Sequence, residues 1–190
     1  MKIIIILLST IILGCSNTQE FKSPKDIVFN GKRFIIGDIL IKERDKKFLS
    51  WWGHSSIVVK ENIIGDFPKF GEKYYEINIQ DWVEKDRKVL VLRYKNNNLK
   101  FQKALLKNIE KYKNNPYSIL LNKENENGFY CSKFIWFIYK KTAEEFGIDL
   151  DIDCNKGWIV FPYDFINSES LIKINLYKTK KGESKYEKSN

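Results

Sequence analysis

The chain has 190 residues, and its 33 lysines and arginines against 24 aspartates and glutamates give a net charge of +9. Its length suits a single domain, and a hydrophobic content of 43% is enough to build a core. Three cysteines and a single histidine are too few, and too widely spaced, for a disulfide-stapled scaffold or a structural zinc site.

The first fifteen residues, MKIIIILLSTIILGC, have the pattern of an export signal. Lys2 is followed by an apolar stretch of roughly 11 residues, which is too short for a membrane span but suits a signal peptide. The final Gly14-Cys15 pair resembles a bacterial lipobox. We therefore expect a lipoprotein signal peptide at 1–14, lipid modification of Cys15 and a tether at 15–30. The alternative is an ordinary cleaved signal in which Cys15 is incidental.

These features predict a protein of the cell envelope, lipid-anchored to a bacterial membrane and facing the periplasm or the exterior. The basic charge suits contact with anionic headgroups or an acidic polymer. Export argues against a nucleic-acid partner. We expect one catalytic domain at 31–176, and residues 177–190, which are charged and lack apolar periodicity, form a flexible tail.

The first half of the domain has the alternating or continuous apolar pattern of strands. The predicted strand segments are 37–43, 54–67 with a turn at Glu61-Asn62, 73–79 and 88–94. They predict a small antiparallel sheet or partial barrel.

Helical spacing follows at 99–112 and 131–146. In the first helix we expect one apolar face, made of Leu99, Leu105, Leu106 and Ile109. In the second, the Cys131 face continues through Phe134, Ile135, Ile138 and Thr142. Residues 159–169 predict a short strand, a proline turn and a small helix. The fold class is therefore α+β, with helices packed against the sheet.

Cys131 and His54 are the residues that point to chemistry. Cys131 stands where a helix begins, and a helix N-terminus and a nearby imidazolium both favour the reactive thiolate. His54, the only histidine, opens a strand. Glu76 on a neighbouring strand is the candidate that would orient His54, because a buried carboxylate needs a partner. The backbone N–H of Cys131 would help to form an oxyanion hole.

The order of GDIL, GHSSIVV, YEI, VLVLRY and FYCSKFIW, from Gly37 to Phe165, resembles the permuted papain-like branch of the NlpC cell-wall peptidase superfamily, in particular the YiiX/YaeF-like amidases. In that branch the histidine strand precedes the cysteine helix. The resemblance implies Cys131 as nucleophile, His54 as its histidine and Glu76 near the third polar position. It implies action on an amide, peptide or acyl bond, with no metal or organic cofactor.

Tyr117, Tyr130 and Trp52 are expected to bind substrate. The Trp51-Trp52 pair has a second interpretation, as a loop cap on the core. Three functions stay open at this point: a hydrolase of cell-wall peptides, a lipid-directed acyl hydrolase or acyltransferase, and a non-catalytic binding lipoprotein. A disulfide between Cys131 and Cys154 would favour the third.

Overall fold

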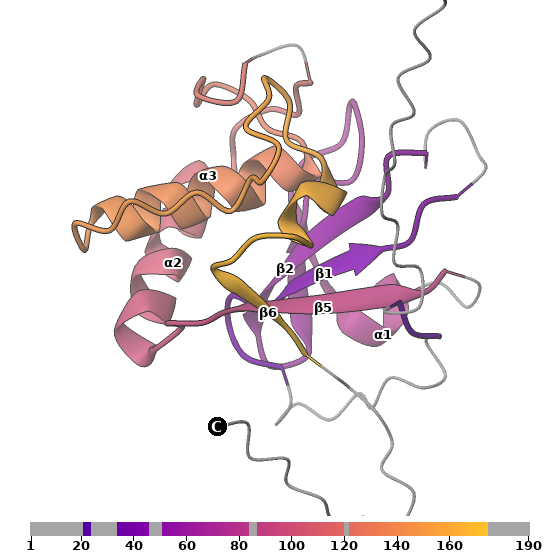
Figure 1. The fold of residues 1–190 in the computed structure, drawn as a ribbon. Coiled ribbons are helices and arrows are strands. Elements are labelled where there is room, and N and C mark those ends of the chain that lie inside the picture. The colour runs from indigo at the N-terminus through magenta and orange to yellow at the C-terminus, as the bar shows by residue number, and fades with distance from the viewer. Residues whose placement is uncertain (1–20, 24–33, 46–50, 84–86, 120–121, 175–190) are drawn as a thin grey trace, which may run out of the picture.

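The computed structural model describes residues 21–23, 34–45, 51–83, 87–119 and 122–174 (Figure 1). The predicted signal peptide, Cys15, most of the tether and the C-terminal tail lie outside these residues. The strands are β1 (Ile39–Lys42), β2 (His54–Lys60), β3 (Ile63–Asp66), β4 (Tyr75–Asn78), β5 (Val89–Tyr94) and β6 (Leu171–Lys173). The helices are α1 (Ile79–Trp82), α2 (Leu99–Tyr112), α3 (Cys131–Glu144) and the 3-10 turn η4 (Pro162–Phe165).

The six strands form one open sheet in the order β4-β3-β2-β1-β5-β6, and every neighbouring pair is antiparallel. This confirms the predicted α+β class with an antiparallel sheet. The predicted turn at Glu61-Asn62 joins β2 to β3, and Asn62 adopts the left-handed φ of 58° that such tight turns require.

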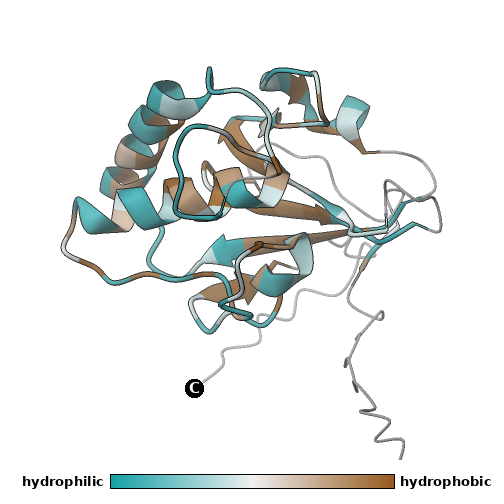
Figure 2. Ribbon diagram, turned by 90° about the horizontal axis from the view of Figure 1, so that it is seen from above, coloured by the Kyte–Doolittle hydropathy of each residue, from teal (hydrophilic) through white to brown (hydrophobic). Residues whose placement is uncertain are grey.

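The sheet has a core on each face. Helices α2 and α3 cover one face, while α1 lies against the other (Figure 1). Alternation along β2 divides the side chains: Ile57 and Val59 pack with α2 and α3, and Val58 packs with the α1 side. Hydrophobic residues gather between the layers, and the outer faces of the helices are hydrophilic (Figure 2).

A buried ion pair fixes the start of β1. Asp38 is fully buried and accepts hydrogen bonds from Arg93 Nε at 2.7 Å and Nη2 at 2.8 Å, and from the Ile35 N–H at 2.9 Å. The hydroxyl of Tyr139 on α3 donates to the carbonyl of Gly37. The cysteine helix is therefore tied to the centre of the sheet.

Three features differ from the sequence prediction. Leu99 is exposed at the first position of α2, whose buried face is formed by Phe101, Leu105, Asn108, Ile109 and Tyr112. Residues 159–160 form no strand, whereas the small helix predicted after them is present as η4. The short elements α1 and β6 were not predicted. None of the described helices is long and apolar enough to cross a membrane.

Candidate active site

His54 and Asp66 come together through the register of the β2–β3 hairpin. Ile57 pairs with Gly65, and extending the register by one residue sets Asp66 opposite Ser56. Because side chains alternate between the faces, Asp66 and His54 are diagonal neighbours on the same face. His54 Nε2 lies 2.8 Å from Asp66 Oδ2. Nδ1 is therefore the ring nitrogen left for another partner.

The Asp66 carboxylate is held from behind by two further donors. Trp82 Nε1 donates to Oδ2 at 2.7 Å and the Tyr75 hydroxyl donates to the same oxygen at 3.3 Å. Asp66 is only 2% exposed. The Trp82 ring also lies 5.8 Å from the His54 ring, centroid to centroid. Helix α1 thus supplies the support that fixes the carboxylate behind the imidazole.

Glu76, the predicted orienting carboxylate, does not contact His54. It pairs with Gly65 in the β3–β4 register, so its side chain leaves the sheet on the face opposite to Asp66. It is exposed, and it accepts a 3.4 Å hydrogen bond from the Tyr74 hydroxyl. Strand β3 also lies between β4 and the histidine strand. The prediction that Glu76 orients His54 is therefore wrong, and Asp66 occupies that place.

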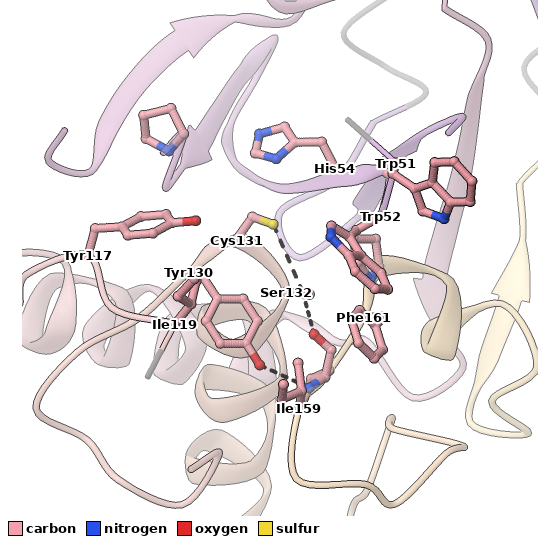
Figure 3. Close-up of a pocket in the computed structure, with 14 residues that line it drawn as sticks. Trp51, Trp52, His54, Tyr117, Ile119, Tyr130, Cys131, Ser132, Ile159 and Phe161 are labelled. Atoms are coloured by element: carbon pink, nitrogen blue, oxygen red, sulfur yellow. Dashed lines mark hydrogen bonds between the residues drawn. The ribbon is translucent and has the colours of Figure 1, made fainter. Parts of the chain in front are cut away.

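Cys131 is the first residue of α3, as the sequence predicted. Its sulfur and the His54 imidazole face one another across the pocket (Figure 3). The residue before it, Tyr130, gives the helix no side-chain cap. The N–H groups of the first helical turn are therefore free of a side-chain capping acceptor at the point where an anion would form.

The pKa values of the two side chains shift towards an ion pair. Burial alone would raise the pKa of the Cys131 thiol, but the adjacent His54 imidazolium, helped by the Ser55 backbone N–H, holds it below its ordinary value. Burial alone would lower the pKa of His54, but the charges of Asp66 and Cys131 raise it to about 10. Both shifts favour a thiolate beside an imidazolium over the neutral thiol and imidazole.

The segment at 159–162 forms one wall of the site. The hydroxyl of Ser132 donates to the Val160 carbonyl at 2.7 Å, and the Val160 N–H donates to the Tyr130 hydroxyl at 2.9 Å. The Trp52 ring stacks on Phe161, with centroids 4.9 Å apart. Ser132 is thus used to hold this wall and not as a second nucleophile.

Gly53 lets the loop that carries Trp52 and His54 pack closely against Tyr163, which follows the 159–162 wall. It has a φ of 78°, and a Cβ placed there would lie 2.8 Å from the ring of Tyr163. Only glycine meets both conditions without strain. The position between Trp52 and His54 is therefore closely packed even though both tryptophans before it are exposed.

The walls enclose a pocket of about 860 Å³ with Cys131 and His54 on its surface (Figure 3). All three residues expected to bind substrate, Tyr117, Tyr130 and Trp52, line it. Tyr117 points its hydroxyl towards Cys131. Burial, with the nearby charges of Cys131 and Asp66, raises the pKa of Tyr117 to about 12, so this hydroxyl stays a proton donor at neutral pH.

A buried lysine supports the loop that leads into Cys131. Lys133 has no exposed surface, and its ammonium donates to the carbonyls of Asn125 and Gly128, at 2.7 Å for the latter. Burial lowers the pKa of Lys133 to about 8. The hydrogen bonds of the ammonium go to backbone carbonyls, and the charge of Glu124 offsets only part of the burial, so this side chain fixes the loop at a cost in desolvation.

Cys131 and Cys154 are both free thiols, so the disulfide that would favour a non-catalytic protein is not formed. Cys154 is exposed. Among the described residues, no group of three or more His, Cys, Asp or Glu side chains is arranged to hold a metal ion.

The chain is similar to known proteins in sequence and in fold. Residues 23–150 match the family described as permuted papain-like amidase enzyme, YaeF/YiiX, C92 family. No curated protein matches the chain. Among solved structures, the fold is similar to that of yiiX from Escherichia coli O157:H7, which is described as a metalloprotein. The TM-score is 0.58 at 14% identity, over 76% of this chain and 98% of that one. The family match covers His54, Asp66 and Cys131, and the chain belongs to the YaeF/YiiX family of permuted papain-like amidases.

Proposed function

We propose that this protein is a cysteine amidase in which Cys131 is the nucleophile, His54 the general acid and base, and Asp66 the residue that orients His54. One observation carries the proposal: the only histidine in the chain is bonded at Nε2 to a buried carboxylate, and its other side faces a thiol at a helix N-terminus. This is the nucleophile, base and orienter arrangement of thiol hydrolases.

In the first half of the reaction the Cys131 thiolate attacks the carbonyl carbon of the amide. The developing oxyanion accepts a hydrogen bond from the Cys131 backbone N–H, and the Tyr117 hydroxyl, which points towards Cys131, is the candidate for a second donor. His54 then gives its Nδ1 proton to the leaving nitrogen, the C–N bond breaks and a thioester forms on Cys131.

In the second half His54, now neutral, takes a proton from water as the water attacks the thioester. The C–S bond breaks, the acid leaves, and the imidazolium and thiolate return. Asp66 keeps its hydrogen bond to Nε2 throughout, which leaves Nδ1 for the proton transfers.

A peptide amide of the cell wall is the first substrate candidate, from the resemblance and from the expected export. The expected lipid anchor at Cys15 would place the enzyme on a membrane of the cell envelope.

A second candidate, a lipid-linked amide or an acyl ester, is favoured by the pocket itself. Apart from the Cys131–His54 pair, its lining side chains are of types that carry no charge at neutral pH, and most are aromatic or aliphatic. An apolar group beside the scissile bond suits these walls better than the charged side chains of a wall peptide.

The test is the pH dependence of iodoacetamide alkylation in the intact chain, with each alkylated cysteine quantified by peptide mass mapping. Cys154 is the internal reference, because burial and its acidic neighbours raise its pKa. We expect Cys131 to react with an apparent pKa below that of Cys154, and His54→Ala to remove the difference. A Cys131 that is inert, or that titrates like Cys154 whether or not His54 is present, contradicts the proposal.

The same preparation then separates the two substrates. Release of peptides from purified cell wall supports the first, and release of fatty acid from lipid vesicles supports the second. Cys131→Ala is the control for both.

A further inference from the structure

Large hydrophobic side chains stand exposed around the mouth of the pocket. Trp158 is 84% exposed and Phe70 is 81% exposed, although neither lines the pocket itself. Trp158 precedes the pocket residue Ile159, and the Phe70 ring meets the ring of Tyr117 edge-on, with centroids 6.4 Å apart. Four other exposed hydrophobic residues line the pocket directly: Trp51, Trp52, Ile119 and Ile159. We call these six residues the rim.

The rim is not part of either core. Both cores are closed between the sheet and its helices, and the rim residues that face solvent add nothing to them. Solvent-exposed hydrophobic groups concentrated around one opening mark an interaction surface. Three of the six are tryptophans, the side chain that prefers the boundary between water and lipid, because its ring is apolar and its N–H is polar.

Charge favours an anionic partner. The chain carries a net charge of +9. Lys69 is next to Phe70 and Lys156 is two residues before Trp158; both are exposed. Lys69 is partly neutralised by Glu72 at 2.9 Å. Lysines beside interfacial aromatics are attracted to anionic headgroups within about a Debye length of the surface.

The path of the N-terminal segment leads to the same side. Phe21 stacks on Tyr163 with ring centroids 5.5 Å apart, and Tyr163 lies against Gly53, beside the rim residue Trp52. Lys22 is fixed to Val89 by backbone hydrogen bonds in both directions. Cys15, the predicted lipid site, is six residues before Phe21, so an extended chain of about 20 Å is the longest possible connection.

We propose that the rim docks into the headgroup region of an anionic phospholipid bilayer, so that the mouth of the pocket opens onto the membrane surface. This inference deepens the proposed function, because it names the membrane as the source of the substrate. The side chains of Trp158 and Phe70 enter the interface, and the lysines beside them contact the phosphates.

The tryptophans of this chain allow a direct test. Of five, Trp82 and Trp136 are buried, and the other three, Trp51, Trp52 and Trp158, belong to the rim. The full chain is reconstituted on vesicles of phosphatidylcholine and phosphatidylglycerol, with or without bromine on the acyl chains. Bromolipid quenches indole emission only on contact. We expect bromolipid to quench up to about three-fifths of the indole emission, which is the share of the three rim tryptophans. We expect the vesicle to protect the same tryptophans from quenching by aqueous iodide.

Two variants that keep every tryptophan show where the contact lies. Phe70→Ser is expected to reduce bromolipid quenching by at least half. Leu99→Ser is the matched control: Leu99 is exposed at the start of α2, whose first turn packs near Tyr139 and Phe146 at the other end of α3 from Cys131. It is expected to leave quenching unchanged. Cys131→Ala is expected to dock like the natural chain, so docking is measured independently of the proposed chemistry.

Three outcomes would overturn the inference. The first is a tethered chain whose rim tryptophans stay open to iodide and untouched by bromolipid. The second is equal loss of quenching in Phe70→Ser and Leu99→Ser, which would place the contact elsewhere. The third is protection from iodide without any vesicle, which would mean that a second copy of the chain covers the rim. If bromolipid quenches the rim tryptophans but Cys131 fails the alkylation test, this inference holds and the proposed function fails.

Discussion

Replacing Asp66 by asparagine removes the charge behind His54 with little change of shape. The carboxylate's hydrogen bonds to His54, Tyr75 and Trp82 all go to Oδ2, and Oδ1 has no partner among the described residues. The amide oxygen of asparagine can take the place of Oδ2 and keep these bonds. The variant therefore isolates the electrostatic effect of Asp66 on the thiol and imidazole.

The size of the effect follows from the geometry. Two unit charges about 4 Å apart interact by about 4 kcal/mol at an effective dielectric constant of about 20, and one pKa unit corresponds to about 1.4 kcal/mol. Loss of the Asp66 charge is expected to lower the pKa of His54, which is about 10 in the natural chain, by about three units. The imidazolium that stabilises the thiolate would then be lost close to neutral pH.

A smaller effect opposes this one. The Asp66 charge also repels the thiolate directly and raises the pKa of Cys131. This repulsion ranks below the attraction of His54. If it has half the strength of the Asp66–His54 interaction, about 2 kcal/mol, the net loss of thiolate stabilisation is about 2 kcal/mol. We expect the alkylation of Cys131 at pH 7 to be slower by about 30-fold in Asp66→Asn.

The assay is iodoacetamide alkylation between pH 5 and 10 with peptide mapping, and Glu76→Gln is the matched control. It removes the same charge from the opposite face of the sheet, and its alkylation profile is expected to match that of the natural chain. The electrostatic role of Asp66 would be refuted if Asp66→Asn has the same denaturant unfolding transition as the natural chain and its Cys131 is alkylated at pH 7 just as fast.

Three predictions concern stability, measured by denaturant unfolding. The pKa of Lys133 is about 8 when folded against 10.5 for an ordinary lysine. The unfolded chain therefore binds the extra proton between these values, and Lys133 should add about 3 kcal/mol to the free energy of unfolding between pH 8 and pH 10.5. This is measured as the difference between the natural chain and Lys133→Met, because His54, with its pKa of about 10, acts in the opposite direction in both chains; an equal slope in both chains would contradict it. Gly53→Ala should cost about 1–3 kcal/mol and slow Cys131 alkylation, through its left-handed φ and its contact with Tyr163. Arg93→Met leaves the buried Asp38 carboxyl without its cationic partner, with the Ile35 N–H still bonded to it, and should cost about 3–5 kcal/mol; a loss below 1 kcal/mol would show that Asp38 is not kept charged by this pair.

Local patterns were enough to predict most of the sheet and both long helices. The strand at 88–94 is a continuous apolar run, and α3 keeps Phe134, Ile135 and Ile138 buried as its spacing predicts. The helix at 99–112 was found at its observed bounds, but Leu99 was assigned to the wrong side. At the first position of a helix there is no preceding turn to bury a side chain. Periodicity alone therefore does not decide whether Leu99 is buried or exposed.

The orienting residue was missed because it depends on strand order. Glu76 was chosen on the assumption that its strand lies beside the histidine strand, but β3 lies between them. The sequence held a usable signal for the pairing of β2 with β3, the turn at Glu61-Asn62. Its register alone would set Asp66 opposite Ile57, on the face away from His54, and only the register shift between Val58 and Lys60 brings Asp66 opposite Ser56 and diagonal to His54. The supporting donor on Trp82 had no such signal, because α1 is a single turn whose position is fixed only by tertiary packing.

The two halves of the site differ in how far the chain must travel to build them. His54 and Asp66 are twelve residues apart on one hairpin, and such a short loop closes at little entropic cost. Cys131 reaches them only when α3 docks on β2, a contact between distant parts of the sequence. The folding chain would thus carry an ordinary, slow thiol until α3 docks. The enzyme would be inert while it folds, and the reactivity of one sulfur atom would report that folding is complete.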